Sequence, residues 1–223
     1  MAGVKSLFAI LTIVAAGPAC GSVSSNSGDA AVSDGAASDG TSPHKRVFVT
    51  SQAYTGNLGG LAGADAKCQL LAGAGNLTGT YKAWLGNATV SVASRVSHAA
   101  LPYTLVDGTV VAGSWTELTS GTLRHAIDRT ELGTLSLGGT NMDCYYVGDG
   151  TGKLVWTNAT ANGSIANTNK TNSCGDDWNT AGPTTAGGPF GDAGSIGKAD
   201  VTWTSLCQSA RCENTAPLYC IEQ

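Results

Sequence analysis

Cysteine is the residue type with the most chemistry to offer in this chain, which holds seven cysteines among 223 residues. An even set of cysteines in a chain that begins like an exported protein is typical of a disulfide framework rather than of reactive thiols. The spacing alone does not select one pairing among the many that are possible. The six cysteines of the predicted framework are Cys68, Cys144, Cys174, Cys207, Cys212 and Cys220.

The seventh cysteine, Cys20, follows a segment with the features of a signal peptide. Lys5 precedes the apolar run 7–16, which is too short to span a bilayer but suits the core of a signal peptide. Small residues then lead to Cys20, as at the processing site of bacterial lipoproteins, although Gly17 stands where a large aliphatic residue is usual. We predict a signal peptide over 1–20 that ends at a lipidated Cys20. Ordinary signal cleavage just before Cys20, followed by secretion, is the alternative.

Other patterns that could hold a metal or act in catalysis are incomplete. The histidines His44, His98 and His125 are scattered, without a spacing typical of zinc sites. The segments 148–153 and 194–197 fall short of the phosphate-loop and nucleophile-elbow patterns. We therefore expect no metal, no cofactor and no enzymatic activity.

One short segment combines oxygen ligands with an indole. Asp176, Asp177 and Asn179 flank Trp178, and carboxylate and amide oxygens are the ligands that calcium prefers. The Glu-Pro-Asn or Gln-Pro-Asp triplet of calcium-dependent lectins is absent, so we favour a solvated loop around a core tryptophan over a calcium site. These four residues and Trp203 are the candidate ligand-binding residues, because exposed aromatic side chains in loops are typical anchors.

Composition limits the classes of partner. The net charge is −4, only 13% of residues are charged, and no basic patch is present, so we expect no nucleic-acid partner. The segment 21–43 is rich in Ser, Ala, Gly and Asp, which predicts a disordered linker. The remaining residues 44–223 suit one domain, which we expect to be monomeric. The 31 glycines indicate a loop-rich fold.

Hydrophobic periodicity predicts the elements that position these residues. Leu61, Ala64, Cys68 and Leu71 share one helical face, which predicts a helix over 61–71 with Cys68 toward the core. The polar, glycine-rich run 158–199 is far longer than a normal connection, which indicates a functional segment or one fastened by cysteines. The expected strands are 46–50, 80–85, 101–106 and 110–111 around an Asp107-Gly108 turn, 153–157 as a central strand, and 218–222.

Several stretches resemble endostatin, the C-terminal domain of certain collagens, and more closely the bacterial endostatin-like domains, which include leptospiral surface proteins. The resemblance covers most of the chain from Arg46 to Glu222, and its first block and closing cysteine pair are the most specific parts. The stretches that resemble the family are Gly59–Cys68, Leu77–Leu85, Val155-Trp156, Cys174–Trp178 and Cys212–Glu222.

The resemblance implies an α+β, C-type-lectin-like fold: a curved mixed sheet with two helices, long loops and disulfide links. It also implies the bridges Cys68–Cys220 and Cys174–Cys212, which leaves Cys144 and Cys207 for a third.

These expectations combine into one hypothesis. The chain would be an outer-membrane or cell-surface lipoprotein, held to the membrane only by its lipid, that displays a non-catalytic domain for binding an extracellular protein or glycan. We place the contact surface in the run 158–199, with Trp178 and Trp203 as anchors. A calcium-dependent lectin and a structural envelope protein without a specific ligand are the alternatives.

Overall fold

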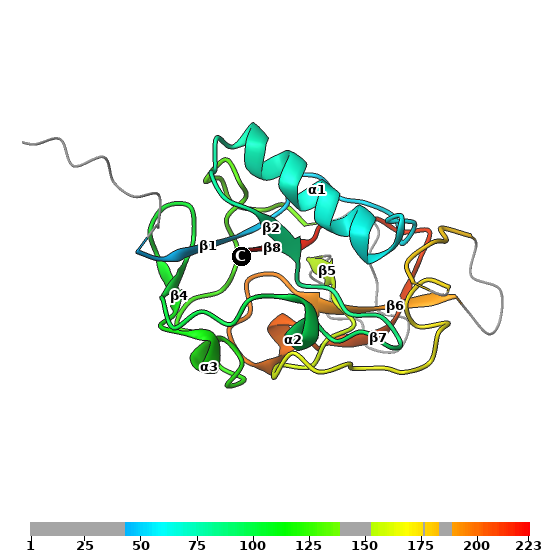
Figure 1. Ribbon diagram of the computed structural model, residues 1–223. Helices are drawn as coiled ribbons and strands as arrows, with labels where there is room; N and C mark the ends of the chain where they lie inside the picture. The colour runs from blue at the N-terminus through cyan, green and yellow to red at the C-terminus, as the bar shows by residue number, and fades with distance from the viewer. Residues whose placement is uncertain (1–42, 139–152, 176, 183–188) are drawn as a thin grey trace, which may run out of the picture. The chain divides into compact units, whose positions relative to one another are not determined.

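Two β-sheets and one long helix organise the described part of the chain (Figure 1). The structure is a computed structural model, and it describes residues 43–138, 153–175, 177–182 and 189–223. These residues belong to one compact unit, Gly40–Gln223. In chain order the elements are β1 (Lys45–Val49), α1 (Gly60–Ala74), β2 (Tyr81–Ala83), α2 (Val92–Arg95), β3 (Tyr103–Thr104), β4 (Val110–Ala112), α3 (Trp115–Leu118), β5 (Leu154–Trp156), β6 (Phe190–Ser195), the 3-10 helix η1 (Val201–Trp203), β7 (Cys207–Arg211) and β8 (Tyr219–Glu222).

The larger sheet is mixed and has the strand order β2-β8-β1-β3-β4. Its central strand β1 runs antiparallel to β8 and parallel to β3, so the first and last strands of the unit are neighbours. Val47 lies opposite Ile221 and Phe48 opposite Cys220 in the ladder. The predicted strands at both ends of the domain are therefore present, as is the hairpin of β3 and β4 around Asp107 and Gly108.

Both faces of this sheet are buried, and the alternation of side chains decides which core each residue joins. Phe48 and Cys220 face a core that α1 covers. Val47 and Ile221 face the second core, where Trp203 is also buried. Strand residues that alternate between two apolar layers leave little of the sheet in contact with water, which suits a domain with few charged residues.

Helix α1 extends beyond its predicted range and buries the predicted face, including Ala64, Cys68 and Leu71. Its polar side chains also protect the outer edge of β2: Asp65 Oδ1 accepts a hydrogen bond from the Ala83 amide at 2.9 Å, and Gln69 accepts one from the Tyr81 amide. Free strand edges invite pairing with other chains, so α1 closes this one. None of the described helices is long and apolar enough to cross a membrane.

The smaller sheet is antiparallel, in the order β5-β6-β7. The predicted strand at 153–157 is present as β5, but it lies at the edge of this sheet instead of in a central position. The run 158–199, expected to be a long connection, contains the central strand β6. Glycines hide this strand from the sequence pattern, because a β-carbon at Gly191 would lie 2.5 Å from the Trp156 ring and one at Gly194 only 2.1 Å from the Trp203 carbonyl oxygen.

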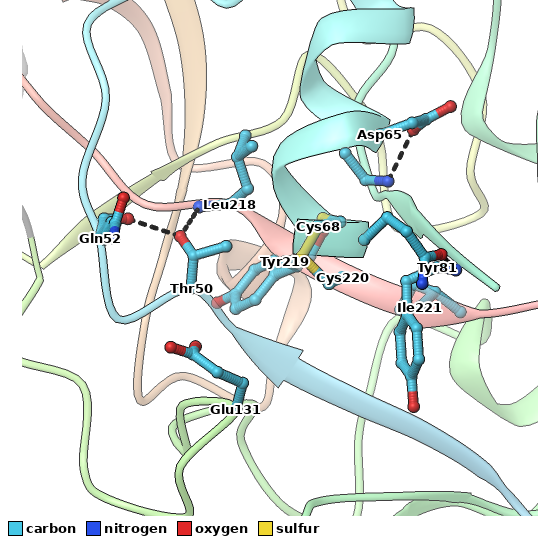
Figure 2. Close-up of a disulfide and its surroundings, with 12 residues drawn as sticks. Thr50, Gln52, Asp65, Cys68, Tyr81, Glu131, Leu218, Tyr219, Cys220 and Ile221 are labelled. Carbon is cyan, nitrogen blue, oxygen red and sulfur yellow. Dashed lines mark hydrogen bonds between the residues drawn. A yellow bond between two sulfur atoms is a disulfide. The ribbon is translucent and has the colours of Figure 1, made fainter. Parts of the chain in front are cut away.

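Both bridges implied by the resemblance are present. Cys68–Cys220 ties α1 to β8 (Figure 2), and Cys174–Cys212 ties the segment before β6 to the residue after β7. Cys207 is also disulfide-bonded. Its expected partner Cys144 lies outside the described residues, so that pairing stays a prediction. The architecture is α+β with a mixed sheet, as expected, but the described residues form three α-helices rather than the two that the resemblance implies.

Candidate functional site

The two tryptophans predicted to anchor a ligand are buried in the core. Trp178 and Trp203 each have 0% of their surface exposed. The Trp178 indole Nε1 donates to the Gly86 carbonyl oxygen at 2.7 Å, and the ring packs against Trp156 with the centroids 5.5 Å apart. The prediction of exposed anchors is therefore wrong for both residues, whereas the core tryptophan that we favoured over a calcium site is confirmed for Trp178. A large indole gains more from packing than from exposure, and Trp178 also satisfies its one donor inside the fold.

Trp203 belongs to a line of aromatic side chains on the other face of the larger sheet. Its ring centroid lies 4.9 Å from that of Trp84 and 5.6 Å from that of Tyr219. The ring centroid of Trp84 also lies 5.8 Å from that of Trp115. The His98 imidazole stacks on Trp115 with the ring centroids 4.0 Å apart. His98 therefore covers a face of the partly buried indole of Trp115, so that face is not open for stacking on a sugar ring.

Asp177 lies beside the start of α1, where it forms local contacts. Its backbone has φ 78°, in the left-handed region, and its Oδ1 accepts from Asn87 Nδ2 at 2.8 Å. A β-carbon at Gly60, the first residue of α1, would lie 2.9 Å from Asp177 Oδ2. A carboxylate at a helix N-terminus interacts favourably with the helix dipole. Asp177 is thus placed for local structure rather than for a ligand.

Asn179 and Asp176 are the remaining candidate ligand-binding residues. Asn179 is exposed and forms an isolated bridge with Asn57, whereas Asp176 lies outside the described residues. Across the described parts of the chain, no three His, Cys, Asp or Glu side chains gather as a metal site would require. The structure therefore does not assemble Asp177, Trp178, Asn179 and Trp203 into one exposed site.

One segment within the run 158–199 is polar and largely exposed, and we call residues 160–172 the polar loop. It is shaped by its own asparagine side chains. Asn162 Oδ1 accepts from the Ser164 amide at 3.0 Å and from the Thr160 hydroxyl. Asn169 Oδ1 accepts from both the amide and the hydroxyl of Thr171. Such turns fix a loop without a hydrophobic core of its own. Its exposed members are Asn162, Ser164, Thr168, Asn169, Lys170 and Thr171.

Asn158 holds the polar loop in place through hydrogen bonds from its side chain. It is fully buried and has φ 43°, a conformation that asparagine tolerates better than most residues. Its Oδ1 accepts from the Asn167 amide at 2.9 Å, and its Nδ2 donates to the Asn167 carbonyl oxygen at 3.1 Å. Nδ2 is also 3.3 Å from the Ser173 hydroxyl. One buried side-chain amide thus adds to the backbone hydrogen bonds that hold the loop.

Asp192, which is not among the predicted site residues, lies at the base of the same loop. It is 3% exposed in β6, and its Oδ1 accepts from Asn172 Nδ2 at 3.3 Å. Burial raises the pKa of Asp192 to about 7, and the hydrogen bond from Asn172 opposes the rise. The available signal was an aspartate inside a glycine-rich segment, which is not enough to indicate a buried strand residue.

No protein-family model matches this chain, and a search of curated proteins finds no match. The site has to be understood from its own chemistry. The polar loop offers amide and hydroxyl groups that donate and accept hydrogen bonds, on a backbone that is already ordered. Such groups suit recognition of hydroxyl-rich or peptide surfaces.

Proposed function

We propose that this chain is an exported lipoprotein that displays a C-type-lectin-like, endostatin-like domain for non-catalytic binding of an extracellular protein or glycan. The observation that carries the proposal is the polar loop 160–172, which is exposed and yet ordered by its own side chains. A loop ordered before it meets a ligand loses less conformational entropy on binding.

The framework around the loop supports this function. Cys174, two residues after the loop, is cross-linked to Cys212, and the strand β6 forms backbone hydrogen bonds with the chain at both ends of the loop. Disulfides indicate an oxidising, extracytoplasmic location. A rigid scaffold that presents a polar loop outside the cytoplasm is the usual construction of a recognition domain. The lipid anchor at Cys20 and the linker 21–43 complete the proposal as means of display.

The contact surface in this proposal is smaller than the run 158–199. Trp178 and Trp203 drop out because they are buried, and β6 drops out because five of its six residues are buried inside the smaller sheet. Among the described residues of the run, the longest exposed stretch is in the polar loop, and Asn179 is also exposed.

An array of glycans and extracellular matrix proteins, probed with the full chain, tests the proposal. We expect binding that Thr168→Trp abolishes, because Thr168 is exposed in the polar loop and an indole there would obstruct a ligand. The matched control is Thr78→Trp, an exposed threonine outside the loop. The double variant Ser164→Ala/Thr168→Ala should weaken binding less than Thr168→Trp does, because it removes two hydroxyl groups without adding a bulky side chain.

The array should be run with calcium and with a chelator. Binding that needs calcium would favour the lectin alternative. No binding to any glycan or matrix protein, or equal binding by both tryptophan variants, would refute the proposal and favour a structural envelope protein.

A further inference from the structure

Asp192 contacts the chain at both ends of the polar loop. Its carbonyl oxygen accepts from the amides of Thr157 at 3.0 Å and Asn158 at 3.4 Å, just before the loop begins. Its amide donates to the Asn172 carbonyl oxygen at 3.2 Å, where the loop ends. Its carboxyl accepts from the Asn172 side chain. One residue of β6 therefore closes the loop by backbone and side-chain hydrogen bonds together.

The carboxyl itself is poorly satisfied. Its Oδ2 is buried and has no hydrogen-bond partner among the described residues, and its Oδ1 shares the Asn172 Nδ2 with the Gln208 carbonyl oxygen, which is nearer at 2.8 Å. The groups that contact it come from the end of β5, the polar loop and, through Asn172, β7, and none of them is charged. Within the described residues, no charged side chain alters the pKa of Asp192.

We propose that Asp192 is a pH-sensitive clamp, which holds the polar loop against β6 while its carboxyl is protonated and loosens the loop when the carboxyl is ionised. The physical reason is the cost of burying a charge that has one long hydrogen bond and no counter-ion. The neutral acid avoids that cost. The ionised acid lowers it by admitting water beside the carboxyl. We expect this to loosen the loop end at Asn172, although the Asn172 hydrogen bond itself favours the ionised form.

The pKa of about 7 places the change near neutral pH. The consequence for ligand binding rests on the proposed function of the polar loop: a loop held in one conformation at lower pH would bind more tightly there. The clamp itself can be tested without any ligand, so its failure and the failure of the proposed function are separate results.

Hydrogen exchange of the full chain at pH 5.5 and pH 8.5, each corrected for the intrinsic exchange rate, provides the test. We expect the protection of amides in 160–172 to fall by roughly thirtyfold at the higher pH, because it changes about tenfold for each pH unit between pH 5.5 and the Asp192 pKa of about 7. In Asp192→Asn, which keeps the shape and removes the titration, protection should be the same at both pH values. Asp200→Asn is the matched control, because Asp200 is exposed and caps η1 through the Thr202 amide; this variant should respond to pH like the wild type.

A second measurement covers the case in which Asp192→Asn fails to fold. The side-chain carboxyl resonances of the wild-type chain should include one aspartate that titrates near neutral pH. The proposal is overturned if no aspartate titrates above pH 6, if wild-type loop protection does not change with pH, or if the change persists in a folded Asp192→Asn. Loop amides that exchange no faster than those of β1 and β8 would also overturn it, because the loop would then open only when the whole domain unfolds.

Discussion

The Arg95 guanidinium lies 2.6 Å from the Asp65 carboxylate, and this partly buried pair joins α2 to α1. Arg95 Nη1 also donates to the carbonyl oxygens of Ala83 at 2.6 Å and Leu85 at 3.1 Å. Asp65 in turn accepts from the Ala83 amide. The two charged side chains thus bind both the amide and the carbonyl group of Ala83, and so hold the edge strand β2 in place.

We expect Arg95→Ala to lower the free energy of unfolding by about 2–4 kcal/mol, because it leaves a poorly exposed carboxylate and two carbonyl groups without their donor. Urea unfolding measures the change. Arg124→Ala is the control: its ion pair with Glu117 is much more exposed, so it should have little effect. Equal losses in the two variants would contradict the structural role of the Asp65–Arg95 pair.

The two defined disulfides should differ in their contribution to stability. Cys68 and Cys220 are separated by 152 residues and Cys174 and Cys212 by 38. In the chain-entropy model the longer closed loop restricts the unfolded chain more, by about 1 kcal/mol here. Paired alanine substitutions at each bridge, compared by urea unfolding, should therefore show the larger loss for Cys68–Cys220. The reverse order would mean that strain or residual structure outweighs loop length.

Two glycines of α1 should respond in opposite directions to alanine. Gly60 has φ +75°, and a β-carbon there would lie 2.9 Å from Asp177 Oδ2, so Gly60→Ala should destabilise by about 1–3 kcal/mol. Gly73 has no neighbouring atom within 4 Å of its β-carbon position. Gly73→Ala should stabilise by about 0.5–1 kcal/mol, the ordinary gain from alanine within a helix. Thermal unfolding of both variants checks the two signs, and a loss in Gly73→Ala would be unexpected.

Trp178 should matter for stability rather than for direct contact with a ligand. Trp178→Ala removes a fully buried indole and should cost about 3–5 kcal/mol. Trp178→Phe should cost less but loses the hydrogen bond to Gly86. Unfolding and array binding have to be measured on the same samples. Loss of binding in Trp178→Phe at unchanged melting temperature would restore Trp178 as a ligand anchor.

The free energy of unfolding should depend on pH through Asp192. Its pKa rises from 3.8 to about 7 on folding, so between these values the folded state holds a proton that the unfolded state has lost. Stability should therefore fall as pH rises from about 4 to about 7, by an amount on the order of 4 kcal/mol, and level off above that range. Asp192→Asn should flatten this dependence and be the more stable protein at pH 8. Urea unfolding across pH 4–8 measures both curves.

The sequence determined the local elements whose patterns are regular. The alternation in 46–50 and 218–222 defined two strands. In β8 the same alternation places Cys220 on the face opposite Tyr219 and Ile221, as the two cores show. Helical spacing located α1 and turned Cys68 inward. These predictions hold because the period of the backbone alone decides which side chains share a face.

The tertiary structure decided features that leave no pattern in the local sequence, namely the strand β6 and the burial of Trp178. β6 exists because Gly191 and Gly194 let its backbone approach Trp156 and Trp203, which no period records. The sequence alone did not decide whether Trp178 is buried or exposed. Its hydrogen bond to the Gly86 carbonyl oxygen and its packing against Trp156 place it in the core. The polar character of 160–172 was plain from its residues. Its fastening to Asp192 depends on chain segments that only folding brings together, because hydrogen bonds and desolvation are set by neighbours in space.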